Sequence, residues 1–309
     1  MFRASGIRTK YMMRPDKNAQ WIEEVITGFV ARSPLNRLGP DNPEPAFDAP
    51  LVGFSSGADP LYHEFVAHIG KFYLTPLSIF QKAFPESPPA VPGDLTVISW
   101  ILPSTTAVRN EQARQTKRPS ERWIRVRYYG EEFNTALRRH MVETLAVQGV
   151  QAVAPMLADF WQRVDQGTYA PCSNWSERHA AHASGLGTFG LCDGLITPKG
   201  KAMRTGSVVA RIDVPPTSRP YRDHHAYCLH FSHNTCGRCI KRCPVNAIDP
   251  EGHNKHRCQA YTEGKMPAFG KQNYGIEIPA CGLCQVNVPC MDHIPRPEEG
   301  SDGPRNENP

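Results

Sequence analysis

The chain has 309 residues, of which 40% are hydrophobic and 21% are charged, and its formal charge is +5. These values are ordinary for a soluble globular protein and exclude a disordered or fibrous class, and the length favours one large core with a smaller module. The mild positive charge neither requires nor excludes a nucleic-acid partner. No stretch approaches the roughly 18 apolar residues of a membrane span, and residues 1–13 contain no apolar signal-sequence core. We therefore expect a cytoplasmic protein that does not bind membranes.

Residues 1–94 are expected to wrap the core and to cap a substrate site. Within them, residues 17–33 have the apolar spacing of a helix. The proline-rich stretches 38–50 and 85–94 are typical of connecting loops. This segment is therefore predicted to surround a core that other residues form.

Residues 95–222 are predicted to form an α+β core. Residues 95–103 are a continuous apolar, β-branched run ended by proline, which suits a strand buried on both faces. Residues 131–155 predict an amphipathic helix that ends near Gly149 and is followed by a strand. Residues 205–214 predict another strand, because they are rich in β-branched residues.

A basic cluster precedes the amphipathic helix. Residues 109–127 contain seven Lys or Arg residues against two Glu. A solvated loop is the expected structure, and contacts to a cofactor's side chains or to an RNA partner are the alternatives.

Residues 185–190 read GLGTFG, which has the G-x-G-x-x-G spacing of a dinucleotide-binding turn. That turn binds a pyrophosphate where a strand precedes it and a helix follows it. Here the alanine-rich segment 173–185 predicts a helix before the glycines, with Ser or Asn as N-cap and Glu177 in the first turn. Residues 191–200 predict a loop and a strand after the glycines. NAD binding is therefore not expected.

Eight of the ten cysteines lie between residues 228 and 290. In a cytoplasmic protein, thiols stay reduced, which favours metal ligation over disulfides. Residues 236–244, CGRCIKRCP, contain C-x2-C-x3-C-P, which is three of the four cysteines of the bacterial ferredoxin run. Full ferredoxin spacing would place the first ligand at His233, whereas the nearest preceding cysteine is Cys228. We favour Cys228 as the ligand and keep His233 as the alternative.

A second, degenerate set of cysteines follows. It comprises Cys258, the CGLC stretch at 281–284, and Cys290, which comes after Cys284 with five intervening residues instead of three. In the ferredoxin run, the cysteine before proline ligates the other cluster, so crosswise pairing predicts two [4Fe-4S] clusters. The predicted ligands are Cys228, Cys236, Cys239 and Cys290 for the first cluster, and Cys243, Cys258, Cys281 and Cys284 for the second.

The cysteines and histidines of this region also allow other interpretations. Two structural zinc sites would use the two C-x2-C pairs but would not account for C-x3-C-P or for Cys258. Cys172 and Cys192 are expected to be small buried hydrophobic residues. The histidine-rich stretch 223–233 lacks helical i, i+4 pairing and is assigned to a linker over the first cluster.

The order of these motifs resembles the epoxyqueuosine reductase and reductive dehalogenase superfamily. The resemblance rests on RYYGEEFNTALRRHM at 127–141, on ASGLGTFGLCDGLITPKGKAMRTGSVV at 183–209, and on the cysteine motifs. It implies a nitroreductase-like core at 95–222 and a ferredoxin-like module with two [4Fe-4S] clusters at 223–295. Residues 296–309 are polar and proline-rich and are expected to form a flexible tail.

The resemblance also implies base-off cobalamin between the core and the cluster module. Glycine suits such a pocket because a flat macrocycle needs backbone without a Cβ atom. The implied pocket residues are the turn Gly185, Leu186, Gly187 and Gly190, and a second wall formed by Leu195, Ile196, Thr197, Pro198, Lys199, Gly200 and Arg204.

The implied proton donor departs from the epoxyqueuosine reductases. Their donor Asp stands about fourteen residues before the first glycine, where this chain has Pro171 beside Cys172. Reductive dehalogenases use a tyrosine with a basic residue or asparagine nearby, which implies Tyr169 and Asn174 as catalytic residues here. An ordinary half-buried tyrosine is the alternative for Tyr169.

We therefore expect a cobalamin-dependent iron-sulfur reductase. Electrons would pass from an external ferredoxin-type or flavodoxin-type donor through two [4Fe-4S] clusters to base-off cobalamin. The reaction would be dehalogenase-like or epoxide-reductase-like, on a small molecule rather than on tRNA. A non-catalytic electron-transfer or corrinoid-carrying protein is the main alternative, and a flavin reductase is another, because nitroreductase-like cores elsewhere hold FMN.

Overall fold

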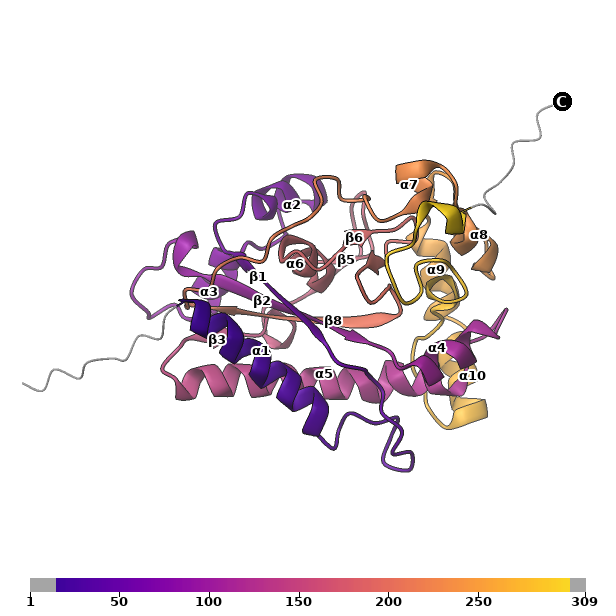
Figure 1. Cartoon of the computed structure of the whole chain (residues 1–309), viewed down its shortest axis with the longest axis horizontal. Helices are drawn as coiled ribbons and strands as arrows, with labels where there is room; N and C mark the ends of the chain where they lie inside the picture. Colours follow the sequence, from indigo (N-terminus) through magenta and orange to yellow (C-terminus); the bar gives the residue numbers. More distant parts are fainter. Residues whose placement is uncertain (1–14, 301–309) are drawn as a thin grey trace, which may run out of the picture.

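The computed structural model describes residues 15–300 and is built around a four-stranded antiparallel sheet with the strand order β1-β2-β8-β3 (Figure 1). The expected mixture of helices and sheet is confirmed. Three two-stranded ribbons accompany the sheet. The strands of the sheet are β1 (Leu51–Ser56), β2 (Thr96–Pro103), β3 (Ala152–Val153) and β8 (Met203–Ala210), and the ribbons are β4 (Arg163–Val164) with β5 (Cys172–Ser173), β6 (Thr188–Phe189) with β7 (Leu195–Ile196), and β9 (Ile248–Asp249) with β10 (Gly252–His253).

Strand β2 is the centre of the sheet, as its apolar sequence predicts. All eight of its residues are buried, and it pairs with β1 on one side and with β8 along its whole length on the other. Successive side chains of a strand point to opposite faces. Ile98 and Trp100 therefore join one hydrophobic cluster, while Val97 joins another on the opposite face.

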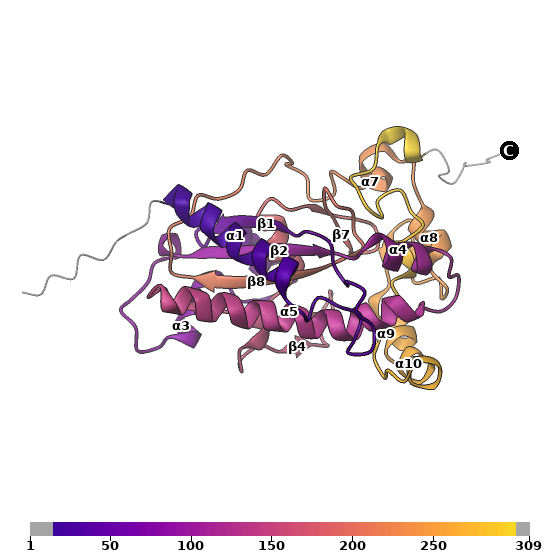
Figure 2. The ribbon, with the colours of Figure 1, turned by 60° about the horizontal axis from the view of Figure 1, so that its bottom comes forward.

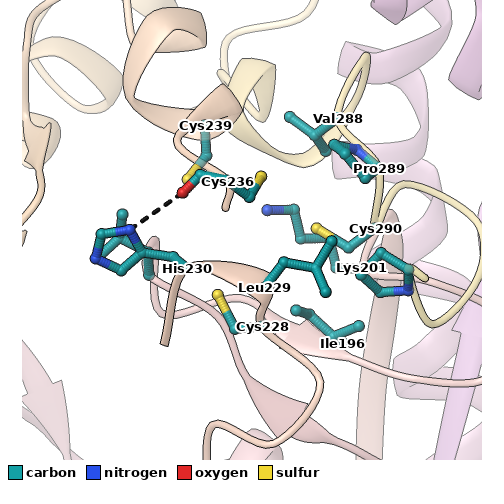
Figure 3. A pocket seen from close by; sticks show the side chains of 12 residues that line it. Ile196, Lys201, Cys228, Leu229, His230, Cys236, Cys239, Val288, Pro289 and Cys290 are labelled. Carbon is teal, nitrogen blue, oxygen red and sulfur yellow. Dashed lines mark hydrogen bonds between the residues drawn. The ribbon is translucent and has the colours of Figure 1, made fainter. Parts of the chain in front are cut away.

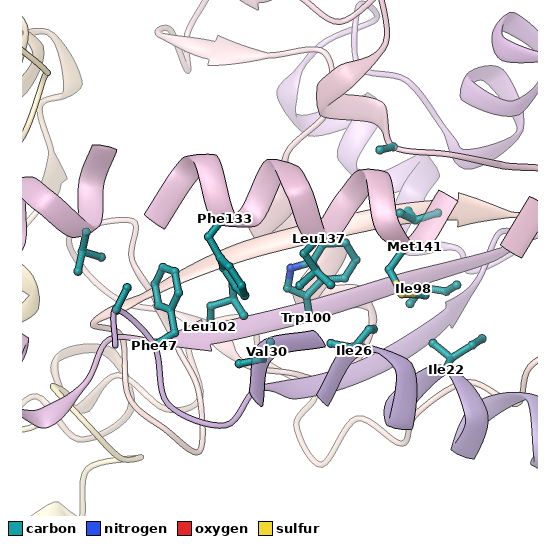
Figure 4. Close-up of a cluster of buried hydrophobic side chains, with 14 of the residues drawn as sticks. Ile22, Ile26, Val30, Phe47, Ile98, Trp100, Leu102, Phe133, Leu137 and Met141 are labelled. Atoms are coloured by element: carbon teal, nitrogen blue, oxygen red, sulfur yellow. The ribbon is translucent and has the colours of Figure 1, made fainter. Parts of the chain in front are cut away.

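Helices α1 (Pro15–Arg32) and α5 (Glu121–Val147) cover the first face of the sheet (Figures 2 and 4). Each helix presents an apolar stripe with helical spacing, as the sequence predicts. Gly149, with φ +74°, follows the end of α5 and ends that helix as expected. The stripe of α1 contains Ile22, Ile26 and Val30, and that of α5 contains Phe133, Leu137 and Met141.

Helices α2 (Leu61–Ile69), α3 (Pro76–Ala83) and α6 (Glu177–Ala183) cover the other face. The Ser176 hydroxyl accepts a hydrogen bond from the His179 N–H and caps α6. Helix α6 runs into the glycine turn, and the short ribbon of β6 and β7 follows it. The prediction that a helix precedes the glycines and a strand follows them is therefore confirmed.

Two expectations about the first half of the chain are wrong. Residues 1–94 do more than wrap a core, because they supply strand β1 of the sheet and the apolar stripe of α1. The basic cluster is mostly helical, since it spans α4 (Thr106–Ala113) and the beginning of α5.

Arg109, Arg122 and Arg125 of this cluster form salt bridges with acidic side chains from residues 41–48. Arg122 lies 2.8 Å from Glu44, and Arg125 lies 2.8 Å from Asp41. These partners come from a loop about eighty residues earlier, so composition alone could not reveal them. The cluster therefore joins two parts of the chain to each other.

The cysteine-rich part of the chain gathers at one end of the sheet, beside the beginning of α5 (Figure 1). Ile276 and Ala280 pack on Ile124, and the Gln112 side chain donates to the Cys281 carbonyl at 2.6 Å. This part contains helices α7 (Leu229–His233), α8 (Arg238–Arg242), α9 (Lys255–Thr262) and α10 (Met266–Tyr274), and the 3-10 turns Leu283–Gln285 and Pro297–Gly300.

None of the helices in residues 15–300 is long and apolar enough to cross a bilayer. The absence of a signal core was inferred from residues 1–13, which lie outside the described residues. Most of the tail expected to be flexible, residues 301–309, also lies outside them.

The buried polar contact between α5 and the sheet generates a stability prediction. Trp100 Nε1 donates to Asn134 Oδ1 at 2.9 Å, and Asn134 Nδ2 donates to the Thr205 carbonyl at 2.9 Å. Replacing Asn134 with Leu leaves the buried Trp100 N–H without this partner and removes one of the two side-chain hydrogen bonds to the Thr205 carbonyl, which Arg138 also contacts. We therefore expect the free energy of unfolding to fall by about 1–3 kcal/mol. Urea denaturation followed by circular dichroism measures this loss. The same substitution at the exposed Asn273 is the control, and equal losses in the two variants would contradict the prediction.

Candidate functional site

Four of the predicted cluster ligands line one cavity at the end of the sheet (Figure 3). Cys228, Cys239 and Cys290 are buried, and Cys236 is half-buried. The other walls are largely apolar, and one buried lysine reaches into the space between the thiols. The cavity is lined by Leu191, Ile196, Lys201, Cys228, Leu229, His230, Cys236, Cys239, Val288, Pro289, Cys290 and Pro295.

Short elements place these thiols. Cys228 is the N-cap residue of α7, Cys239 lies in α8, and Cys236 stands just before the N-cap of α8. The Cys290 carbonyl accepts a hydrogen bond from the Lys201 N–H at 3.0 Å, which holds Cys290 beside the start of β8. The four cysteines therefore reach the cavity from three separate parts of the chain.

His233, the alternative first ligand, does not line this cavity. Its side chain is exposed, and its Nδ1 lies 2.8 Å from the hydroxyl of the neighbouring Ser232. His230 does line the cavity, but its Nδ1 is 3.1 Å from the Cys236 carbonyl. The geometry therefore favours Cys228, which stays a predicted ligand.

The second predicted ligand set lies next to the first. Cys243 directly follows α8, Cys258 lies in α9, and Cys281 and Cys284 flank the beginning of a 3-10 turn. Burial raises the pKa of Cys281 to about 11, with further contributions from the charges of Cys258 and Cys243. Burial lowers the pKa of His253, but hydrogen bonds to Asp193 and Cys258 raise it to about 10. The four thiols are therefore electrostatic neighbours and form a second group.

Within residues 15–300, no three His, Cys, Asp or Glu side chains are placed to hold a single metal ion. A [4Fe-4S] cluster makes a different demand, because its four thiolates surround the cluster instead of converging on one ion. Four thiols around a cavity with largely apolar walls fit that demand in donor type and number.

Cys192 lies between the two groups of thiols. It is buried, as expected, and hydrogen bonds to Cys239 of the first group and Cys284 of the second lower its pKa. The Lys201 ammonium is 3.3 Å from its sulfur. Neither Cys192 nor Lys201 belongs to a spaced motif, so the sequence predicts only a small buried residue at Cys192 and gives no signal for Lys201.

The glycines of the implied cobalamin pocket approach this chain's own backbone. A Cβ atom at Gly187 would overlap the Ile196 carbonyl, and one at Gly200 would overlap the backbone of Met291 and Asp292. Gly185 similarly faces the Ser218 carbonyl. Glycine is therefore required at these positions because other backbone segments of this chain lie close to them.

The other implied pocket residues surround these glycines. Leu186, Leu195, Ile196 and Thr197 are buried, and the Thr197 hydroxyl donates to the Gly200 carbonyl at 2.7 Å. Gly190 is also buried and Pro198 is exposed. Lys199 Nζ donates to the Ala49 carbonyl at 2.9 Å. Their assignment to a corrinoid pocket stays a prediction.

The two implied catalytic residues have different surroundings. Asn174 is buried, and its side chain donates to the Phe160 carbonyl at 2.8 Å and accepts from the Gln162 N–H at 3.1 Å. Its amide thus connects two loop segments. Tyr169 is exposed, and its ring lies 4.5 Å from that of His68. The catalytic roles stay predictions, and Tyr169 is the one whose side chain is open to solvent.

A buried ionic network that the sequence did not reveal lies beside β8. Arg138 is 2% exposed, and it contacts Glu131 at 2.9 Å, Glu177 at 3.3 Å and the Thr205 carbonyl at 3.2 Å. Burial raises the pKa of Glu177 to about 7, although Arg138 opposes this shift. Burial also lowers the pKa of Arg204 to about 9. Arg204, an implied pocket residue, thus contributes to a polar region that joins α5, α6 and β8.

Comparison with known proteins gives matches only among solved structures. A scan against models of protein families finds no match, and a search of curated proteins finds none. The chain is similar to a reductive dehalogenase whose structure suggests a mechanism for B12-dependent dehalogenation, with 16% identity, a TM-score of 0.53, and coverage of 96% of this chain and 35% of that one. The chain is also similar to the catabolic reductive dehalogenase NpRdhA, with 16% identity, a TM-score of 0.52, and coverage of 93% of this chain and 34% of that one. A selenomethionine-labelled epoxyqueuosine reductase matches with 16% identity, a TM-score of 0.42, and coverage of 91% of this chain and 70% of that one.

The resemblance expected from the sequence is confirmed as a likeness of fold to the reductive dehalogenases. The chain spans about a third of the length of those proteins. Whether the core is nitroreductase-like, whether the cysteine-rich part is ferredoxin-like, and where the segments 1–94, 95–222, 223–295 and 296–309 divide are points that stay predictions.

The contact at Gly200 generates a prediction about packing beside the cavity. Gly200 has φ +73° and faces backbone, whereas Gly275 has φ +71° and faces open space. Replacing Gly275 with Ala should cost about 1 kcal/mol of unfolding free energy from backbone strain alone. Replacing Gly200 with Ala should cost clearly more, because Met291 and Asp292 must also move. Urea denaturation of both variants measures the difference, and equal losses would contradict the overlap.

The raised pKa of Glu177 predicts a pH dependence of stability. Because its pKa is about 7 in the folded chain and 4.5 is its ordinary value, the folded state binds this proton more tightly than the unfolded state. The free energy of unfolding should therefore fall as pH rises from about 4.5 to 7, and Glu177→Gln should remove that fall, which amounts to about 3 kcal/mol.

Thermal unfolding of wild-type and Glu177→Gln protein at several pH values checks this prediction. The stability of the variant relative to wild type should increase over the interval. Glu86→Gln, which changes an exposed carboxylate, should leave the pH profile unaltered. Parallel profiles for wild type and Glu177→Gln would show that Glu177 titrates normally.

Proposed function

We propose that the chain is an iron-sulfur reductase with two [4Fe-4S] clusters that uses base-off cobalamin to reduce an unidentified small molecule. The observation that carries the proposal is the convergence of Cys228, Cys236, Cys239 and Cys290 on one cavity, with a second group of four thiols beside it. The likeness of fold to the reductive dehalogenases supports it. The clusters would supply one-electron transfer, and the cobalamin would supply the centre that reduces the substrate.

The side chains of this chain have defined tasks under the proposal. The first ligand set would be Cys228, Cys236, Cys239 and Cys290, and the second would be Cys243, Cys258, Cys281 and Cys284. Leu191, Ile196 and Val288 exclude water from the first site, because they line it and are buried. An external ferredoxin-type or flavodoxin-type protein would deliver electrons.

Under the proposal, cobalamin would be bound by the residues of the glycine stretch, from Gly185 to Gly200, together with Arg204. Tyr169 is proposed to supply a proton to the substrate, because its phenol is exposed and a phenol can act as a general acid. Asn174 is proposed to position the loop that carries Tyr169, because its amide already connects residues on both sides of that loop. A cytoplasmic location is part of the proposal.

One observation favours a second candidate function. Gly187 and Gly200 face this chain's own backbone, so the glycine stretch is explained without a macrocycle. An iron-sulfur electron-transfer protein that has no cobalamin would retain the thiol groups and need no proton donor. The two functions therefore differ in cobalt content.

Metal analysis distinguishes the candidates. The protein is purified anaerobically from cells supplied with cobalamin, and iron, cobalt and zinc are measured together with the EPR spectrum of the reduced protein. The reductase predicts about eight irons and about one cobalt per chain. Iron without cobalt, in protein that also fails to bind added cobalamin, would support the electron-transfer protein. Zinc in place of iron would contradict both.

Single substitutions test the first ligand set. Cys228→Ser should lower the iron content from about eight to about four atoms per chain, because a cluster lacking one thiolate is lost. His233→Ala and Cys172→Ser should leave the iron content unchanged, since neither residue lines the cavity. Loss of iron in His233→Ala and not in Cys228→Ser would reverse the assignment.

A further inference from the structure

The Lys201 side chain is a buried cation that faces sulfur atoms. Lys201 is 3% exposed and lines the cavity, and its ammonium is 3.3 Å from Cys192 Sγ. Cys290, Cys239 and Cys284 are its other electrostatic partners. No carboxylate within the described residues forms a salt bridge with it. These sulfur partners include members of both predicted ligand sets.

The position of Lys201 is fixed by the backbone. Its N–H donates to the Cys290 carbonyl at 3.0 Å, and the Ala202 N–H donates to the Met291 carbonyl at 3.3 Å. Strand β8 begins at the next residue, Met203, and Gly200 packs against the same segment on the other side. The ammonium therefore enters the cavity from the end of the sheet where β8 begins, between the thiols (Figure 3).

Burial of this charge requires a negative partner. Moving an ammonium out of water costs several kcal/mol unless a counter-charge compensates. A neutral thiol provides no such charge, whereas a thiolate does. Cys192 Sγ, at 3.3 Å from the ammonium, and the thiolates of a bound cluster are the groups that could supply it. A [4Fe-4S] cluster bound by four thiolates carries net negative charge, and that charge becomes more negative by one when the cluster is reduced.

We propose that Lys201 sets the reduction potential of the first cluster by stabilising its reduced form. A fixed positive charge beside a cluster favours the state with more negative charge, so it raises the reduction potential. A bound cluster would gain one electron from a ferredoxin-type or flavodoxin-type donor, which would be oxidised by one electron, and no bond would be broken. The inference rests on the two clusters of the proposed function and does not require cobalamin.

Cys192 has a related place in this arrangement. It belongs to neither predicted ligand set, yet its sulfur lies within hydrogen-bonding reach of Cys239 and Cys284 and of the Lys201 ammonium. Lys201 and Cys192 therefore lie together between the two groups of thiols. Of these two residues, Lys201 is the one whose positive charge can be removed by a side chain of similar shape, as in Lys201→Gln.

A redox titration followed by EPR tests the proposal on the holoprotein. The signal of the first cluster is assigned as the one lost in Cys228→Ser. At the potential where half of this cluster is reduced in wild type, Lys201→Gln should lower the ratio of reduced to oxidised cluster about tenfold, which is a shift of about 59 mV to more negative potential. Lys271→Gln removes the same charge from an exposed site and should leave the potential unchanged. Lys201→Arg, which keeps the charge, should stay close to wild type.

Equal potentials in Lys201→Gln, Lys271→Gln and wild type, with about eight irons in each, would overturn the inference and leave the proposed function intact. Wild-type protein without iron would instead overturn the proposed function. Lys201→Gln could also lose the first cluster altogether. If Lys201→Arg then retains the first cluster, the positive charge is what the cluster requires, which supports the inference. If Lys201→Arg loses the cluster as well, side-chain shape is what matters, which overturns the inference.

Discussion

The backbone pairing of residues 201–202 with residues 290–291 connects the cysteine cavity to the sheet. On one side of this pairing β8 begins, and β8 is anchored along its whole length to the fully buried β2. On the other side is Cys290, which completes the group of four thiols. Because Gly200 leaves no space for a side chain, the two segments stay in contact. The buried centre of the sheet therefore positions one wall of the proposed cluster site.

This connection also explains the electrostatics of the site. The residue that donates its N–H to Cys290 is Lys201, so the same contact that places a thiol delivers a buried positive charge among the thiols. Apolar side chains from both segments, Ile196 and Val288, line the remaining space. A dry cavity strengthens the interaction between such a cation and an anionic cluster, because the local dielectric constant is low.

The sequence predicts those features that depend on local pattern. The apolar run of β2, the amphipathic stripe of α5 and the capped helix α6 all follow from periodicity and end signals, and the grouping of four distant cysteines follows from their spacing. Features that depend on distant partners were missed. Arg122 and Arg125 of the basic cluster pair with Glu44 and Asp41, which lie far earlier in the chain. The glycine stretch signals close approach correctly, but its sequence cannot specify whether backbone or a cofactor approaches.

The position of iron tests the central claim most directly. Crystals grown without oxygen can be measured on both sides of the iron absorption edge, so that an anomalous difference map marks iron alone. The account predicts one strong peak in the cavity bounded by Cys228, Cys236, Cys239 and Cys290, near the Lys201 ammonium, and a second peak among Cys243, Cys258, Cys281 and Cys284. An anomalous map without iron at the first position, or with zinc there, would contradict it.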